Sequence, residues 1–338
     1  MLSRAAVHPR TVLFPTSTSR RIGRLAISRL RSANGSLTTT RFYVSKDTTT
    51  SSFKKRPSAI AQRLPDPDQV VAHHRFREFE LDGRVFIVTG GAGGLGLTLA
   101  EALVEAGGNV YCLDWAESPP QAFYVAKDRC SHFGGSLHYR QVDVQKAQQL
   151  DDVIADIAAE HSRMDGLIAA AAIQKVTPAL EYEPEKITEM MNINYGGVYL
   201  SAVSCARQMI KHKTPGSLVL IGSMSGLNAN KGFTSSVYNS SKAAVIQLGR
   251  SLAMEWGRII DGKAIRVNVL CPGNIMTPMV EKNFADDPGL RKIWEDANMM
   301  GRISEPHEYR GAALFMLSDA SSFMTGSYLV IDGGYTAW

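Results

Sequence analysis

The sequence lacks the residue patterns that hold disulfide frameworks or structural metals. Its four cysteines, Cys112, Cys130, Cys205 and Cys271, are far apart and form no C-x-x-C pair. Its eight histidines form no H-E-x-x-H or similar spacing. We therefore expect reduced, mostly buried thiols and no structural metal.

Long apolar runs are missing as well. No stretch approaches the roughly 20 consecutive apolar residues of a membrane-spanning helix, so we expect a soluble protein without a membrane partner. The chain has 338 residues, of which 44% are hydrophobic, and this share suits a buried core. Such a length allows two domains, or one large α/β domain of about 250 residues with an appendage.

Acidic residues are absent from the N-terminus. Residues 1–46 contain eight Arg and one Lys, and the first acid is Asp47. Removing these nine from the 37 basic residues leaves 28 against 32 acidic ones, so the formal net charge of +5 comes from the N-terminus alone. The remainder is mildly acidic and has no basic surface that would indicate a nucleic-acid partner.

The first 43 residues have the composition of a mitochondrial transit peptide, because they are rich in Arg, Ser and Thr and free of acid. On a helical wheel, residues 20–31 place apolar side chains on one side and arginines on the other. Residues 41–43, R-F-Y, resemble the matrix-protease pattern, which predicts cleavage after Tyr43. We expect a mitochondrial matrix protein; the alternative is a cytoplasmic protein with a disordered basic tail.

Residues 44–80 are polar and contain Pro57, Pro65 and Pro67, so we interpret them as a linker. From Leu81 onward, short β-branched runs alternate with helical patterns. The runs predict strands within residues 84–90, 109–114, 137–144, 166–172, 216–222, 264–270 and 327–332. This alternation predicts one α/β domain over 81–338, a Rossmann-type doubly wound parallel sheet of about seven strands with helices on both faces. In such a sheet, ligands bind beyond the carboxyl ends of the strands.

The first predicted strand ends in TGGAGGLG, residues 89–96, and leads directly into a helical pattern. Glycines at 90, 94 and 96 give T-G-x-x-x-G-x-G, in which missing β-carbons let backbone amides approach a pyrophosphate. We therefore predict that Gly90, Gly94, Leu95 and Gly96 bind a dinucleotide. A tight glycine-rich turn without a ligand is the alternative.

The second and third predicted strands end in acids. Asp114 lies 24 residues after Gly90, where a carboxylate can accept hydrogen bonds from both ribose hydroxyls and would repel a 2'-phosphate. Because the glycine loop also contains no Lys or Arg, the sequence favours NAD over NADP. Asp143 is predicted to bond the adenine amino group, with Val144 against the ring, although Asp143 also suits a helix N-cap.

Residues 236–256, SVYNSSKAAVIQLGRSLAMEW, place Tyr238 and Lys242 four apart on one helix. Alone this spacing decides little, because such pairs commonly occupy a solvated helix face. Together with the glycine motif, it resembles the short-chain dehydrogenase/reductase family, over essentially all of residues 81–338. The resemblance implies an α/β nicotinamide-dependent enzyme that acts on CH–OH groups.

The family resemblance supplies partners for this pair. A serine 13 residues before the tyrosine belongs in such a site, which indicates Ser225, and the family asparagine corresponds to Asn194 in MNINYGG. The predicted tetrad is therefore Asn194, Ser225, Tyr238 and Lys242. Ser223 precedes Gly226 at another common family spacing and is the rival of Ser225.

Two further segments are interpreted through the resemblance. The loop 271–278, CPGNIMTP, is similar to the family segment in which the backbone of Ile275 and the hydroxyl of Thr277 hold the nicotinamide carboxamide. Residues 169–172 are AAAA where the family usually has N-N-A-G, so an asparagine that braces neighbouring strands is lost. The backbone of Ala170 is still expected to contact the adenosine ribose.

Free tyrosine has a pKa of about 10, so near neutral pH it is protonated and is a poor base unless its phenolate is stabilised. Lys242 and the positive nicotinamide ring are expected to stabilise the Tyr238 phenolate, which removes the proton of a secondary alcohol as hydride leaves. Ser225 would hold the substrate oxygen, and Asn194 would hold a water that relays the proton.

Closer likenesses, such as IGSMSG at 221–226 and VIDGGYTAW at 330–338, are to fungal polyol dehydrogenases, above all the NAD-dependent, ribulose-forming D-arabinitol 2-dehydrogenases. We therefore expect a polyol/ketose substrate. The alternatives are a mitochondrial 3-oxoacyl thioester reductase that uses NADPH, and a cofactor-binding scaffold or sensor without catalysis. The resemblance also implies a homo-oligomer, usually a tetramer, built through helices around 187–212 and 237–258.

The role of the segment 279–306 is the hardest in the domain to infer from its sequence. It contains Phe284, Trp294, Met299 and Met300 between charged residues. Such a segment is either a lid over the nicotinamide or a partner-facing helix.

Overall fold

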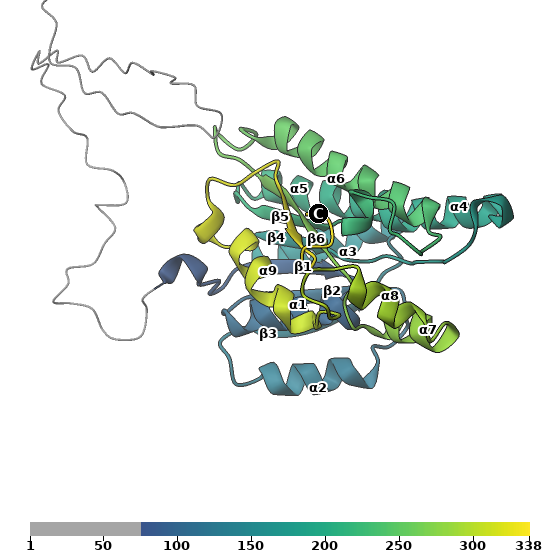
Figure 1. The fold of residues 1–338 in the computed structure, drawn as a ribbon. Coiled ribbons are helices and arrows are strands. Elements are labelled where there is room, and N and C mark those ends of the chain that lie inside the picture. Colours follow the sequence, from purple (N-terminus) through teal and green to yellow (C-terminus); the bar gives the residue numbers. More distant parts are fainter. Residues whose placement is uncertain (1–75) are drawn as a thin grey trace, which may run out of the picture. The chain divides into compact units, whose positions relative to one another are not determined.

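The computed structural model describes residues 76–338, and its centre is a parallel sheet of seven strands in the order β3-β2-β1-β4-β5-β6-β7 (Figure 1). Every neighbouring pair is parallel. The strands are β1 (Val85–Thr89), β2 (Asn109–Asp114), β3 (Ser136–Gln141), β4 (Gly166–Ala169), β5 (Ser217–Ile221), β6 (Arg266–Pro272) and β7 (Tyr328–Ile331). The predicted α/β class and all seven predicted strands are confirmed.

The predicted transit peptide, 1–43, lies outside the described residues, as does the predicted linker up to residue 75. The last residues of that linker are described and include a short 3-10 helix, Arg77–Phe79. Leu81, the first residue of the predicted domain, is fully buried.

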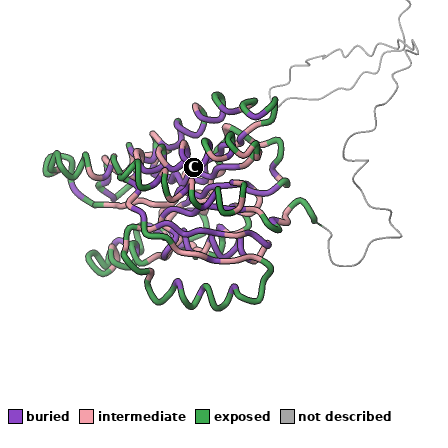
Figure 2. The backbone as a smooth tube through the Cα atoms, turned by 180° about the vertical axis from the view of Figure 1, so that it is seen from behind, coloured by how far each residue is buried: buried purple, intermediate pink, exposed green. Residues whose placement is uncertain are grey.

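The central strands are apolar on both faces because helices cover the sheet on both sides. All five residues of β1 are buried, as are all five of β5, which explains their continuous rather than alternating apolar pattern. Figure 2 shows the buried residues gathered in the strands and on the inner faces of the helices. The parallel sheet is therefore the middle layer of three.

One face of the sheet packs against α1 (Gly94–Glu105), α2 (Gln121–Cys130) and α9 (Arg310–Leu317). The other face packs against α3 (Ala147–His161), α5 (Val198–Lys211) and α6 (Ser236–Trp256). In α3 the buried side chains are Leu150, Ile154, Ile157 and Ala158, at the spacing of one helix face. This spacing explains why α3 could be recognised from the sequence.

The long helix expected around 187–212 is interrupted. It consists of α4 (Pro184–Met191), a π-helical turn over Asn192–Gly197, and then α5. Two short helices, α7 (Pro278–Asp286) and α8 (Leu290–Asp296), follow β6. With neighbouring residues they enclose a small separate apolar cluster of Phe233, Val280, Leu290, Trp294 and Ile303.

All four cysteines are buried free thiols. Within residues 76–338, no three His, Cys, Asp or Glu side chains lie together so that they could hold a metal ion. In the same part of the chain, every helix is too short or too polar to cross a membrane.

Asp165 ties the amino ends of β1 and β4 together. Its carboxylate is 6% exposed, accepts a hydrogen bond from the backbone N–H of Val85 at 2.8 Å, and pairs with Arg163 through Nε and Nη2 at 2.7 and 2.8 Å. Removing the carboxylate leaves a buried donor without a partner.

Asp165→Ala should lower the free energy of unfolding by roughly 1–3 kcal/mol, because the buried N–H of Val85 loses its acceptor. Urea denaturation followed by circular dichroism measures the change. The control is Asp296→Ala, which removes an exposed i,i+4 pair with Lys292 and should leave the midpoint within error. Equal midpoints for the two variants would contradict the role of Asp165.

Candidate active site

A cavity of about 770 Å³ opens at the carboxyl edge of the sheet. It lies where the strand order reverses between β1 and β4, the position at which doubly wound sheets bind ligands. Residues at the ends of six strands line it, among them Gly90, Asp114, Asp143, Ala170, Ser223 and Ile275. The cavity therefore brings the predicted site residues together, with the exception of Asn194, which lies behind its wall.

The glycine loop after β1 needs its glycines for backbone shape and for space. Gly90 and Gly94 have φ of +67° and +52°, a left-handed conformation that favours glycine. A β-carbon on Gly90 would lie 2.8 Å from the Cα of Ala171, and one on Gly96 would collide with the carbonyl oxygen of Gly90. Because α1 begins at Gly94, the free amides of its first turn lie at the cavity, where they suit a pyrophosphate.

Asp114, the last residue of β2, is fixed at the cavity wall by backbone donors. Its Oδ2 accepts a hydrogen bond from the N–H of Ala92 at 3.1 Å, and its Oδ1 accepts one from the N–H of Trp115 at 2.9 Å. Lys242 is the one Lys or Arg among the described cavity residues. The Asp114 end therefore offers an anion and no cation that would neutralise a 2'-phosphate.

The predicted adenine side consists of Asp143, Val144 and Ala170, and all three line the cavity. The Oδ1 of Asp143 accepts a hydrogen bond from the N–H of Gln145 at 3.0 Å and so closes a local turn. The alternative interpretation of Asp143 as a helix N-cap is wrong, because α3 begins at Ala147 and its N-cap is Lys146. The adenine contact of Asp143 stays a prediction.

The AAAA segment keeps its place through Thr89 rather than through an asparagine. The N–H of Ala170 donates to the carbonyl of Thr89 at 3.1 Å, and the N–H of Ala171 lies 3.5 Å from the Thr89 hydroxyl. Thr89 is 1% exposed, and β1 and β4 remain paired up to Ala169. The segment is thus held to β1 without an asparagine side chain.

Tyr238 and Lys242 do not lie on a solvated helix face. Tyr238 is in the first turn of α6 and lines the cavity, and Lys242 follows one turn later with only 2% of its surface exposed. The Nζ of Lys242 donates to the carbonyl oxygen of Ile221 at 2.9 Å and lies 5.7 Å from the centre of the Tyr238 ring. The structure therefore assigns this pair to the cavity.

Burial shifts both groups toward their neutral forms. It raises the pKa of Tyr238 to about 12, against a hydrogen bond with the Ser223 side chain that favours the phenolate. It lowers the pKa of Lys242 to about 8, against the attraction of nearby Cys271. Near neutral pH the cavity wall therefore presents a protonated phenol beside a still largely charged ammonium.

The structure favours Ser223 over Ser225 as the partner of Tyr238. The side chain of Ser223 hydrogen-bonds the Tyr238 side chain, whereas the Oγ of Ser225 accepts a hydrogen bond from Nδ2 of Asn230 at 3.0 Å. Ser223 has the extended backbone of a strand end, and the 3-10 turn Met224–Gly226 then redirects the chain. The preference for Ser225, which rested on its distance from Tyr238 in the sequence, does not match this geometry.

Asn194 lies in the π-helical turn between α4 and α5 and is fully buried. Its Oδ1 accepts from the N–H of Ile173 at 2.8 Å, and its Nδ2 donates to the carbonyl of Ile173 at 2.9 Å and to the Oγ of Ser241 at 3.1 Å. It therefore ties the loop after β4 to α6 beside Lys242. Such π turns are frequent at functional sites.

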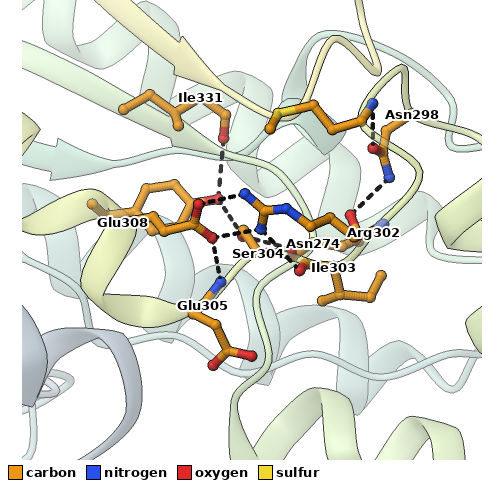
Figure 3. A network of polar contacts seen from close by, with 10 residues as sticks. Asn274, Asn298, Arg302, Ile303, Ser304, Glu305, Glu308 and Ile331 are labelled. Carbon is orange, nitrogen blue, oxygen red and sulfur yellow. Dashed lines mark hydrogen bonds and ion pairs between the residues drawn. The ribbon is translucent and has the colours of Figure 1, made fainter.

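The loop that carries Ile275 and Thr277 is braced by the network in Figure 3. Ile275 pairs with Ser304 in an isolated parallel bridge, and Ser304 donates to the carbonyl of Asn274 from both its N–H and its hydroxyl, at 3.0 and 2.8 Å. Arg302 holds Glu308 through two hydrogen bonds of 2.8 and 2.6 Å. A β-carbon on Gly94 would lie 4.0 Å from Thr277, so Thr277 faces the glycine loop.

The segment 279–306 contributes to the cavity wall through Met279, Val280 and Trp294. Trp294 is 4% exposed and packs edge-on against Phe233 and Phe284, with ring centres 5.2 and 5.3 Å apart. Asn283 in α7 donates to Oε1 of Gln174 at 3.2 Å, which links this segment to the loop after β4. These contacts make the segment part of the cavity wall, and its role as a lid stays a prediction.

Several cavity residues were missed at the sequence level: Trp115, Gln174, Asn230 and Phe233. Trp115 directly follows the end of β2, which was a usable signal, whereas Gln174 lies farther along the loop after β4. Asn230 has a φ of +46°, a conformation that asparagine tolerates better than most residues. Its position depends on the fold of the loop after β5 and has no short sequence signature.

Comparisons with known proteins agree with this geometry. Residues 90–336 match a family model described as enoyl-(acyl carrier protein) reductase. The short-chain dehydrogenase/reductase notP' of Aspergillus versicolor is 41% identical over 77% of this chain and 89% of its own. The ribulose-forming D-arabinitol 2-dehydrogenase of Scheffersomyces stipitis is 34% identical over 77% of this chain and 96% of its own. The L-tagatose-forming galactitol 2-dehydrogenase of Cereibacter sphaeroides is 35% identical, with 77% and 98% covered.

The fold has close counterparts among solved structures. A short-chain type dehydrogenase/reductase from Mycobacterium marinum superposes with a TM-score of 0.72 at 33% identity, over 78% of this chain and 99% of its own. A gluconate 5-dehydrogenase from Burkholderia cenocepacia in complex with NADP and tartrate gives 0.70 at 31%, with 77% and 98% covered. The cavity, its glycine loop and the Tyr238–Lys242 pair thus occur in a chain that belongs to the short-chain dehydrogenase/reductase family.

Proposed function

We propose that this protein oxidises a secondary alcohol of a polyol to the ketose, reversibly and with NAD. One observation carries the proposal. The Tyr238 hydroxyl is hydrogen-bonded by Ser223 and lies one helical turn from the buried ammonium of Lys242, at the wall of a cavity that also contains the glycine loop. This arrangement provides a proton acceptor, a group that aligns the substrate oxygen and a fixed positive charge.

The residues present suit a nicotinamide dinucleotide. The space kept free at Gly90 and Gly96 would admit the pyrophosphate, and Asp114 would accept hydrogen bonds from the adenosine ribose hydroxyls. Ile275 and Thr277, on the braced loop after β6, would hold the carboxamide. Lys242 would bind the second ribose through the donor capacity that its bond to Ile221 leaves free.

Bound NAD+ would accept the hydride and would add a positive charge beside the phenol. The charge of Lys242 and the hydrogen bond from Ser223 both favour the Tyr238 phenolate, opposing the burial that raises its pKa. Tyr238 then removes the hydroxyl proton while Ser223 holds the substrate oxygen. Asn194, joined to the backbone of Ile173 and to Ser241, keeps the loop after β4 in register with α6.

The polar groups of the cavity support a polyhydroxylated substrate. Ser225, Asn230 and Gln174 line the cavity with hydroxyl and amide groups, and none of these is charged. Such groups pair with neutral hydroxyls, and a polyol leaves fewer of them unpaired than an apolar alcohol does. The arabinitol and galactitol dehydrogenases among the relatives act on substrates of this kind, as their names state.

The preference for NAD rests on Asp114 and on the lack of a nearby cation among the described cavity residues. A 2'-phosphate placed near this carboxylate would meet repulsion without compensation. The exposed ring of Trp115 next to Asp114 adds no positive charge.

Two further proposals concern the setting of the enzyme. The acid-free, arginine-rich residues 1–46 support a mitochondrial matrix address. The exposed apolar side chains of Tyr199 and Ile210 on α5 and of Met254 on α6 support a homotetramer built through these helices.

The function is tested by initial rates of the full chain with D-arabinitol, xylitol, mannitol and sorbitol, each with NAD+ and with NADP+. We expect turnover of D-arabinitol with NAD+ and little with NADP+. Tyr238→Phe should keep NADH binding and lose at least about 100-fold in kcat, the usual worth of a general acid or base. NADPH-driven reduction of an acetoacetyl thioester, with no polyol oxidised, would instead support a 3-oxoacyl reductase. NADH binding without any turnover would support a scaffold or sensor.

Substitutions of Ser223 and Ser225 should change different kinetic constants. Ser223→Ala should lower kcat by roughly 100-fold, because it loses a group that contacts the reacting oxygen. Ser225→Ala should raise KM for the polyol with kcat nearly unchanged, because it loses the bond that orients Asn230. Steady-state kinetics of both variants measure this, and the reverse pattern would restore Ser225 as the serine of the tetrad.

Lys242 should make the stability of the apo-protein depend on pH. Its pKa falls from 10.5 to about 8 on folding, so the unfolded chain binds more protons between these values, and the cost of burying the charged lysine is relieved as pH rises from 8 to 10.5. Lys242→Met removes the effect. Because only wild type gains stability with pH through this group, the free energy of unfolding of Lys242→Met minus that of wild type should fall by about 3 kcal/mol across this range, at about 1.4 kcal/mol per pKa unit. Urea titrations at pH 7, 8, 9 and 10 measure it, and a difference that stays constant with pH would contradict the burial of a charged lysine.

A further inference from the structure

The residues after β7 form a turn that is closed by one of its own side chains. The Oδ1 of Asp332 accepts from the N–H of Gly334 at 2.9 Å, and its Oδ2 accepts from the N–H and the hydroxyl of Thr336 at 2.9 and 2.7 Å. Gly333 and Gly334 have φ of +66° and +84°, which allows the chain to reverse. We call residues 332–336 the C-terminal turn. It holds Tyr335 in a fixed direction.

Tyr335 reaches a loop about a hundred residues earlier in the chain. Its hydroxyl accepts a hydrogen bond from the backbone N–H of Lys231 at 2.9 Å. Lys231 stands between two left-handed residues, Asn230 at φ +46° and Gly232 at φ +75°. Glycine adopts positive and negative φ about equally readily and asparagine tolerates positive φ, so local preference does not fix this backbone, and the tie to Tyr335 is one contact that selects the observed conformation.

The loop held in this way, residues 228–234, contributes to the wall of the cavity that Tyr238 also lines. Asn230 lines the cavity, with its Nδ2 bonded to Ser225 at 3.0 Å and its Oδ1 3.5 Å from Nδ2 of Asn239. Phe233 lines it too and packs on Trp294. A shift of Lys231 would therefore move both a polar and an aromatic part of the wall.

The C-terminal turn also contacts the other segments of that wall. The carbonyl of Gly333 accepts a hydrogen bond from the N–H of Met300 at 3.2 Å, next to the network of Figure 3. A β-carbon on Gly273 would lie 2.7 Å from the Cα of Asp332, so the turn packs closely on the loop that carries Ile275. The turn therefore joins three segments that are far apart in sequence.

We propose that Tyr335 is a positioning residue for substrate recognition. Through the N–H of Lys231 it holds the loop 228–234 so that the amide of Asn230 meets a second hydroxyl of the substrate. This role rests on the proposed oxidation of a polyol. It implies that the Tyr335 hydroxyl sets the affinity for polyhydroxylated substrates and that its loss leaves the binding of the dinucleotide unaffected.

The test compares Tyr335→Phe with wild type in the full chain, with Tyr328→Phe as a matched control. Tyr328 is partly exposed on β7 and stacks with Arg250, and the control removes the same hydroxyl at a distance from the loop. Amide hydrogen exchange of the loop 228–234, measured by mass spectrometry without substrate, reports on the tie to Lys231. Steady-state rates with D-arabinitol and with 2-butanol, a monohydric alcohol, report on recognition.

We expect faster exchange of the loop in Tyr335→Phe and a KM for D-arabinitol raised about 5-fold, the size of one ordinary hydrogen bond. The kcat, the KM for NAD+ and the rate on 2-butanol should stay near wild type, and Tyr328→Phe should change none of these. Unchanged exchange would overturn the proposal, as would faster exchange without any change in KM for D-arabinitol. If wild type oxidises no polyol, the proposed function fails by itself, and exchange still decides whether Tyr335 holds the loop.

Discussion

The arrangement of the active site depends on one buried charge, the ammonium of Lys242. Its hydrogen bond to the carbonyl of Ile221 joins α6 to the end of β5, and this sets the distance between the two elements that carry Tyr238 and Ser223. Burial opposes the charge and lowers the pKa of Lys242 to about 8. Keeping this cation beside the phenol therefore lowers the stability of the folded state.

The opposite end of the cavity is organised by backbone rather than by charge. Gly90 approaches the backbone of Ala171 so closely that it admits no β-carbon, and the Thr89 hydroxyl lies near the N–H of Ala171. Asp114 is then fixed by two backbone donors. A loop held by close packing can present amides to a phosphate without reorganising, which is why small residues dominate this region.

The sequence was informative where a local rule determines the structure. Strands buried on both faces appear as continuous apolar runs, so all seven could be predicted, and the glycine spacing and Asp114 follow from the same strand ends. The serine beside Tyr238 could not be read in this way, because a 3-10 turn after Ser223 decides which hydroxyl reaches the phenol. Asn230 and the π-helical turn around Asn194 depend on contacts with distant segments, and no short pattern encodes such contacts.

The position of the C-terminal turn in the chain affects the order in which the cavity is completed during synthesis. Its contacts with Lys231, Met300 and the loop at Gly273 come from residues that follow all seven strands in the chain. A nascent chain that has released β1 to β6 from the ribosome still lacks the edge strand β7 and the turn that completes the substrate wall. Tyr335 can therefore fix the loop 228–234 only after the strands that lead to the glycine loop, Asp114 and Ile275 have been made.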